Sequence, residues 1–259
     1  MKRVYAPALD ATKDKYVGKI LPSNNYGDFI ILEYNAANDV KIKFLDTGFV
    51  DTVFAAQMHT RKVRDSSLPT TCGFGYIDIE GASIGRKMTK EYQLWNNMIT
   101  RCYNENLRHK NPTYKDCHVS EEWRYLSNFK EWCNNQIGFN EDGWHLDKDI
   151  LSKDNKVYSE DTCVFVPSEI NSMLTNSRRG RGAYPVGVYY KKRISKYASQ
   201  ISKNGEVIHL GNFDTPEEAF YVYKEAKEDY IKQKAEFWKG QIDPKVYDAL
   251  MNFTIEITD

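Results

Sequence analysis

Four side chains in one short stretch near the middle of the chain are able to do metal or acid–base chemistry. His145, Asp147, Lys148 and Asp149 lie within residues 145–149. If this stretch is a strand, the side chains of His145, Asp147 and Asp149 share one face. Carboxylates bind hard divalent cations, and an imidazole can act as a ligand or as a proton acceptor. The stretch therefore predicts one end of a metal site, with an exposed, solvated strand as the alternative interpretation.

Charge is distributed unevenly around this stretch. Residues 141–170 contain eight acidic and three basic side chains, whereas residues 171–210 contain eight basic side chains and a single acidic one, Glu206. An acidic pocket beside a basic strip suits a metal site next to a polyanion. Two solvated surfaces of opposite charge are the alternative interpretation.

A strand, a turn, a second strand and a helix are expected to position the central residues. Residues 146–151 and 162–166 have strand-like composition, and Asp154 and Asn155 form the turn between them. Pro167 is suited to the first position of the following helix, which carries Asn171.

Length and composition are typical of a globular α+β protein with several small domains. The chain has 259 residues, equal numbers of acidic and basic residues (36 each), and 41% hydrophobic residues. Apolar runs are all much shorter than the ~18 residues of a membrane helix. The first residues are not followed by the apolar stretch of a signal peptide. We therefore expect a cytoplasmic protein with no membrane partner.

Residues 1–70 are expected to form a small β-barrel-like domain. Residues 26–34, 40–44 and 49–53 have strand patterns and are joined by tight turns. After a glycine-rich connector, Thr89 caps an expected helix over 90–102, and Ser120 begins a second one. The apolar positions of both helices recur every three or four residues, so we expect them to pack in a core.

Five cysteines are present, and no two of them form a C-x-x-C pair. Their odd number and wide spacing argue against a disulfide framework. The spacing of Cys102, His109, Cys117 and His118 is irregular for zinc, so structural zinc is not expected.

The last part of the chain, residues 183–259, reads as three strands and a helix. Asn204-Gly205 is a strong hairpin signal, and Thr215-Pro216 begins the helix. The runs VGVYY at 186–190, YASQI at 197–201 and LGNFDTPEEA at 210–219 resemble the APETALA-two or ethylene-response-factor DNA-binding domain. That resemblance implies a three-stranded sheet packed on one helix, with the sheet face in the major groove of double-stranded DNA.

Carried over by position, the resemblance implies a set of DNA-binding residues on or between the first strands. Arg193 is the best candidate for reading a base, because arginine can bind guanine with two hydrogen bonds. The lysines are expected to contact phosphates. A basic linker over 176–182 precedes the module. The resemblance gives Tyr190, Lys191, Lys192, Arg193, Lys196, Tyr197 and Lys203, and the basic linker adds Arg178, Arg179 and Arg181.

The middle segment, residues 71–175, resembles the ββα-metal core of HNH homing endonucleases from bacteriophages, with a helical lead-in. The resemblance rests on LDKDIL at 146–151, NKVYS at 155–159 and TCVFVP at 162–167. It implies Asp147 and Asn171 as ligands of one divalent ion, Mg²⁺ or Mn²⁺. It also places Lys148 at the position of the family's catalytic histidine and Thr162 at the position of the residue that orients it. Asn155 would form a turn near the site.

Lysine at position 148 leaves three interpretations open. Burial and a nearby metal could lower the pKa of Lys148 until it acts as a base. Lys148 could instead stay charged and stabilise the transition state while His145 or Asp149 accepts the proton. In the third interpretation the site does not cleave and only binds DNA.

These observations predict a metal-dependent DNA endonuclease or nickase of the phage homing type, located in the host cytoplasm if a phage encodes it. The alternative is a non-catalytic DNA-binding protein derived from such a nuclease, acting as a phage regulator or host-takeover factor. A weaker hypothesis treats the N-terminal barrel as a protein-interaction module. Protein partners, the recognition sequence and the oligomeric state are not predicted.

Overall fold

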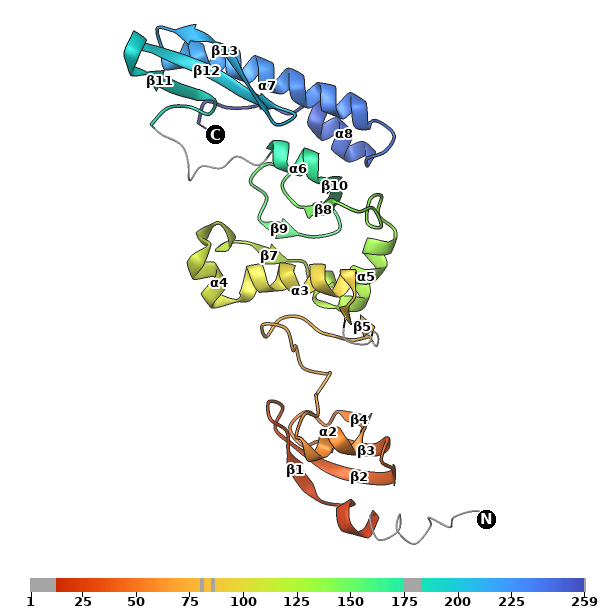
Figure 1. The fold of residues 1–259 in the computed structure, drawn as a ribbon. Helices are drawn as coiled ribbons and strands as arrows, with labels where there is room; N and C mark the ends of the chain where they lie inside the picture. The colour runs from red at the N-terminus through yellow and green to blue at the C-terminus, as the bar shows by residue number, and fades with distance from the viewer. Residues whose placement is uncertain (1–12, 80–81, 85–86, 175–182, 259) are drawn as a thin grey trace. The chain divides into compact units, whose positions relative to one another are not determined.

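The structure is a computed structural model of the chain, and it describes residues 13–79, 82–84, 87–174 and 183–258 (Figure 1). The chain divides into two units. One comprises Met1–Glu105 and Arg124–Ser127, and the other comprises Asn106–Trp123 and Asn128–Asp259. Both combine helices with small sheets, so the predicted α+β class is confirmed. Within the described ranges, no helix is long and apolar enough to cross a membrane.

A four-stranded antiparallel sheet lies in the first unit. Its strands are β1 (Ile20–Pro22), β2 (Asp28–Ala36), β3 (Asp39–Phe44) and β4 (Val50–Val53), paired in that order. Alternate side chains of β2 and β3 are buried and pack with Met58 of α2 (Ala55–His59). Instead of the expected barrel-like arrangement, the strands form an open sheet in which β1 and β4 are the two edges among the described residues. Closure requires the edge strands to pair, and these two are the shortest of the four.

The helix predicted after Thr89 is present as α3 (Lys90–Tyr103), preceded by the short strands β5 (Ser83–Ile84) and β6 (Lys87–Met88). The Thr89 hydroxyl accepts a hydrogen bond from the Tyr92 amide at 3.3 Å, as an N-cap should. Trp95 and Ile99 are fully buried. Gly75 passes so close to them that a Cβ there would lie 2.5 Å from Ile99, which explains a glycine at this position.

The helix expected from Ser120 is divided into two elements. The Ser120 hydroxyl accepts the Trp123 amide at 3.4 Å and begins the short η2 (Glu122–Arg124), and α5 (Leu126–Asn134) follows separately. Trp123 and Phe129 are fully buried, and Trp132 packs on Phe165. These aromatic residues are therefore core, as predicted. The preceding elements are α4 (Glu105–Lys110), η1 (Pro112–Tyr114) and β7 (His118–Val119).

The predicted order of strand, turn, strand and helix is present in the second unit. β8 (Trp144–Asp147) pairs antiparallel with β10 (Val164–Pro167), and α6 (Ser168–Leu174) follows directly. Between them, β9 (Val157–Tyr158) pairs in parallel with β7. Two boundaries differ from the sequence expectation. β8 ends at Asp147 instead of continuing to residue 151, and Pro167 is the last residue of β10, opposite Trp144, instead of the first residue of the helix.

The predicted C-terminal sheet and helix are also present. β11 (Val188–Lys191), β12 (Lys196–Lys203) and β13 (Glu206–Phe213) form an antiparallel sheet, with the 3₁₀ turn η4 (Lys192–Ile194) between the first two strands. Asn204 and Gly205 both have positive φ, 51° and 84°, as a tight hairpin requires. α7 (Pro216–Trp238) begins at a capping box formed by Thr215 and Glu218 and packs on all three strands (Figure 1).

α7 belongs to two hydrophobic clusters of the second unit. On one side, Phe220, Tyr223 and Tyr230 pack with Ile201 of the sheet. In its second half, Ile231 and Ala235 pack with β10 and α6, and α8 (Pro244–Met251) joins the same cluster. One helix therefore supports both the ββα segment and the C-terminal sheet.

Candidate functional site

β8 and α6 bring two of the predicted site residues together. The side-chain nitrogen of Asn171 lies 3.4 Å from Nδ1 of His145, although 26 positions separate them in the chain. Both line an open groove of about 550 Å³ together with Ser168, Glu169 and Ser172. His145 is exposed and Asn171 is partly exposed. This groove therefore offers an imidazole, an amide and hydroxyls to an incoming ligand.

Asp147, the predicted first metal ligand, does not line this groove. One of its carboxylate oxygens, Oδ1, accepts hydrogen bonds from the backbone amides of Asp149 and Ile150, both at 2.8 Å. These bonds end β8 and start the turn that follows. Burial is the main reason that the pKa of this half-buried carboxyl is raised, and the two backbone amides oppose that shift.

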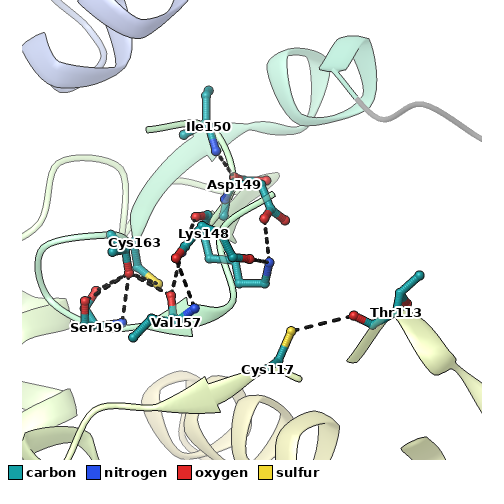
Figure 2. A network of polar contacts seen from close by, with 11 residues as sticks. Thr113, Cys117, Lys148, Asp149, Ile150, Val157, Ser159 and Cys163 are labelled. Atoms are coloured by element: carbon teal, nitrogen blue, oxygen red, sulfur yellow. Dashed lines mark hydrogen bonds and ion pairs between the residues drawn. The ribbon is translucent and has the colours of Figure 1, made fainter. Parts of the chain in front are cut away.

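Lys148, at the position expected for a base, has its ammonium group engaged in the loop that follows β8 (Figure 2). Its Nζ lies 2.5 Å from Oδ1 of Asp149, donates to the carbonyl oxygen of Asn155, and stands 5.7 Å from the centre of the Tyr158 ring. The residue is only 8% exposed. In this arrangement the ammonium stabilises a loop.

Asn155 forms the turn predicted for it, and it does so in partnership with Lys148. Its side-chain amide donates to the carbonyl of Lys148 at 2.8 Å and to that of Val157 at 2.7 Å, while its oxygen accepts the Val157 amide. Lys148 and Asn155 thus each bind the backbone carbonyl of the other. The loop between β8 and β9 is closed by this reciprocal pair.

Thr162 and Asp149 have local structural contacts. The hydroxyl of Thr162 donates to the Val157 carbonyl at 2.8 Å and accepts the Ser159 amide at 3.1 Å, so it holds the turn before β10. Asp149 lies beyond the end of β8, so strand alternation does not align it with Asp147, and its exposed carboxylate pairs with Lys148. The neighbouring Cys163 thiol is buried, which raises its pKa to about 12.

One of the two expected metal ligands is already partly engaged within the protein. Asp147 and Asn171 have suitable oxygens, but Oδ1 of Asp147 already accepts two amides. No group of three or more His, Cys, Asp or Glu side chains in the described part of the chain could hold a metal ion. We therefore derive no catalytic step through a bound metal.

Glu169, which sequence reasoning missed, is the acidic member of the groove. Its carboxylate pairs with Lys234 of α7 and accepts a hydrogen bond from the Trp238 indole at 3.2 Å. The hydrogen bond from Lys234 is the main cause of its lowered pKa, so Glu169 carries a negative charge at neutral pH. Only the contact with a helix 65 positions later reveals this pair, and sequence spacing gave no signal for it.

Strand pairing decides which residues of the C-terminal sheet face away from α7. Val188 packs in the cluster with α7, and Ser199, its partner in β12, is fully buried. Side chains alternate from there, with one register shift between β12 and β13 at Ser199 and Gln200. The face opposite α7, which we call the outer face, therefore carries Tyr189, Lys191, Lys196, Gln200, Ser202, Val207, His209 and Asn212.

The expected DNA-binding residues divide between several environments. Lys191 lies on the outer face, and Lys192 and Arg193 are exposed on η4. Lys196 is also on the outer face, but it forms an ion pair with Asp214. Arg178, Arg179 and Arg181 lie outside the described residues.

The other three members of the expected set lie on the α7 side of the sheet. Tyr190 and Tyr197 are paired partners whose ring centres lie 5.1 Å apart, and both contact Tyr184. Lys203 stands over the Tyr230 ring of α7 at 5.5 Å. Sequence reasoning missed Tyr189, Gln200, His209 and Asn212. Strand alternation counted from Val188 could have found Tyr189, but His209 and Asn212 share a face only because the register shifts between Ser199 and Gln200.

Comparisons with protein-family models, with curated proteins and with solved structures found no match to this chain.

Proposed function

We propose that this chain binds double-stranded DNA through the outer face of the sheet β11–β13 and the adjoining turn η4. The observation that carries the proposal is the composition of this surface. Amide, imidazole and lysine side chains project from one side of a twisted three-stranded sheet, and the opposite side is packed on α7. A strand ribbon of this kind fits the major groove.

The side chains of this surface suit two kinds of contact. Lys191, Lys192 and Arg193 bring positive charge to the end of the sheet, where they can reach phosphates. Gln200 and Asn212 carry amides, which can pair with adenine through two hydrogen bonds. The resemblance to the APETALA-two domain supports the same face. Because Tyr190, Tyr197 and Lys203 lie on the α7 side of the sheet, we expect the outer-face residues to contact DNA in their place.

Titration of fluorescent duplexes, measured by anisotropy at several salt concentrations, tests the proposal. Replacing Lys192 by Gln should lower the affinity and reduce the slope of log K against log salt by about 0.9, the value for one lost phosphate contact. Lys203→Gln is the matched control, because it removes the same charge from the α7 side of the sheet. Equal losses from both substitutions, or no duplex binding by the native chain at low salt, contradict the proposal.

Base reading requires a separate measurement. Sequences selected by the native chain from a random duplex pool should be compared with those selected by Gln200→Ala. Loss of an amide that reads a base should relax one position of the selected site, at a cost of about 1–3 kcal/mol in discrimination. An unchanged preference would show that Gln200 does not read sequence.

Metal-dependent phosphodiester cleavage is the second candidate function. It is favoured by His145 and Asn171 sharing a groove at the start of α6, in a ββα segment that ends its first strand with Asp147. Plasmid nicking should be measured with Mg²⁺ or Mn²⁺ for the native chain, His145→Ala and Asp147→Ala. Nicking that both substitutions abolish supports catalysis. Nicking equal in all three proteins assigns the activity to a contaminant.

Lys148→His is informative for this second candidate. Because Lys148 is buried in the loop after β8, a histidine there is expected to leave the groove unchanged and to create no cleavage. A protein that binds duplexes but nicks under none of these conditions has the role of a non-catalytic DNA-binding regulator.

A further inference from the structure

One large aliphatic side chain, that of Val207, stands among the polar side chains of the outer face. Val207 is 67% exposed, the largest exposed fraction of any large hydrophobic residue in the part of the chain that the structure describes. It lies in β13, opposite Ser202 of β12. Water is an unfavourable environment for its two methyl groups, so a ligand that covers them with apolar atoms gains hydrophobic free energy.

The neighbours of Val207 on this face are groups that form hydrogen bonds. Gln200 and His209 are paired across β12 and β13, two residues along the strands from the pair formed by Ser202 and Val207. Positions two residues apart on a strand are separated by about 7 Å, which is also about the length of two base-pair steps. A methyl group beside hydrogen-bonding atoms is what a T·A pair presents in the major groove. The outer face has the same combination of groups.

We propose that Val207 determines base specificity by packing its methyl groups against the C5 methyl of a thymine in the major groove of bound DNA. The inference rests on the DNA-binding function proposed above and deepens it, because it names a base that the outer face selects. Of the four bases only thymine carries a methyl group in that groove. An apolar contact there favours thymine over cytosine without any hydrogen bond to the base.

A thermodynamic cycle that removes the methyl groups from each partner in turn tests the inference. The duplex selected by the native chain is prepared with uracil, which lacks only the C5 methyl, at each thymine position separately. The native chain should bind the thymine duplex about fourfold more tightly than the uracil duplex at one position, as expected for burial of about one methyl group. Val207→Ser should bind these two duplexes with equal affinity.

Ile208→Ser is the matched control. Ile208 is the next residue of β13 and is 42% exposed, but it pairs with Ile201, which packs with α7, so it lies on the other side of the sheet. This variant should keep the native preference for thymine over uracil. Thermal unfolding of every variant checks that the fold is kept. If Val207→Ser does not fold, Val207→Ala takes its place, and its shorter side chain should give a smaller preference than the native valine.

The outcomes separate this inference from the proposed function. If the native chain binds no duplex DNA, the proposed function fails and the inference fails with it. If the chain binds DNA but uracil weakens binding at no position, or weakens it equally for the native chain and the Val207 variant, Val207 does not select thymine and DNA binding still stands. A selected site without thymine, or an equal loss of preference in Ile208→Ser, overturns the inference in the same way.

Discussion

Lys148, a side chain that could take part in acid–base chemistry, instead stabilises a loop of the protein. Its buried ammonium binds the Asn155 carbonyl and the Asp149 carboxylate, and Asn155 binds the Lys148 carbonyl in return. A buried charge is tolerated only when it is paired and hydrogen-bonded. The loop between β8 and β9 supplies both partners, so the lysine and the loop depend on each other.

Substituting Lys148 by Met should therefore destabilise the second unit. Loss of the ammonium leaves the Asn155 carbonyl without this donor, at a cost of about 1–3 kcal/mol. Lys156→Met, at an exposed position of the same loop, should change the free energy of unfolding by less than about 0.5 kcal/mol. Urea denaturation of the two variants measures the difference. Equal stabilities would show that the buried ammonium contributes nothing.

The residue-scale predictions from sequence were correct in some places and incomplete in others. Asn155 is the predicted turn residue, whereas Asn171 lies beside His145 and not beside Asp147 in the groove, although the resemblance paired it with Asp147. Strand alternation could not place Asp149, because Asp147 ends the strand with its own side chain. It could not reveal the burial of Lys148 either, since that depends on a loop returning from seven residues away.

At the scale of elements, α7 is held at its centre by the last residues of the chain. Lys224 donates to the Ile255 carbonyl at 2.5 Å, and Glu228 accepts the Ile255 amide at 2.8 Å. The two side chains also form an ion pair at 2.9 Å. Ile255 is only 3% exposed. The C-terminal segment therefore completes the cluster between α7 and the sheet.

The ion pair at Glu228 should give the fold an acid-dependent stability. Burial opposes ionisation, but the Ile255 amide and Lys224 outweigh it, so the pKa is lowered from its ordinary value of 4.5. A lowered carboxyl pKa contributes stability that is present above 4.5 and is lost as the pH falls through the folded-state value. Glu228→Gln should be less stable than the native chain by about 1 kcal/mol near neutral pH, and this difference should shrink in acid. Thermal melts across this pH range measure it, and a constant difference would contradict it.

Gly187 fixes how closely the sheet approaches α7. Its φ is +77°, and a Cβ there would lie 2.1 Å from the Tyr223 ring. Gly205 at the hairpin has φ of +84° but open space around it. Gly205→Ala should cost about 1–2 kcal/mol from backbone strain alone. Gly187→Ala should cost about 1–3 kcal/mol more, because the ring must move. Denaturation of both variants gives the comparison, and equal losses would exclude the clash.

Elements were largely predictable where local signals are strong. The Asn204-Gly205 hairpin, the Thr89 and Thr215 caps and the aromatic core positions all follow from local chemistry. The open sheet of the first unit was not predictable, because pairing of the edge strands β1 and β4 is a long-range event without a local sequence signal. The division of the expected helix after Ser120 into η2 and α5 was also missed, because it has no local sequence signal either.

At the scale of the whole molecule, the ββα segment and the C-terminal sheet share one supporting helix. Ile231 and Ala235 of α7, with Val246 and Leu250 of α8, fill the cluster behind β10 and α6. The sequence predicts domain boundaries at residues 175 and 183, because a basic linker lies between them. Composition could not show that the core on one side of the linker is completed from the other side.

Truncation after Thr175 should consequently expose the core of the ββα segment. The fragment loses the α7 and α8 side chains that cover Val164, Val166 and Ile170. We expect it to bind a hydrophobic dye and to lose its cooperative thermal transition. A fragment that melts cooperatively and binds no dye would show that the segment folds alone. The proposed DNA contacts of the sheet are therefore better tested by single substitutions than by deletion.

The different exposure of the cysteine thiols allows one of them to be labelled selectively. Of the five cysteines, four are buried and only Cys72 is exposed. The native chain should therefore accept one maleimide dye, located in the first unit, without any engineering. If the second unit binds DNA as proposed, energy transfer from that dye to an acceptor on one end of a duplex would report how close the first unit comes to the duplex.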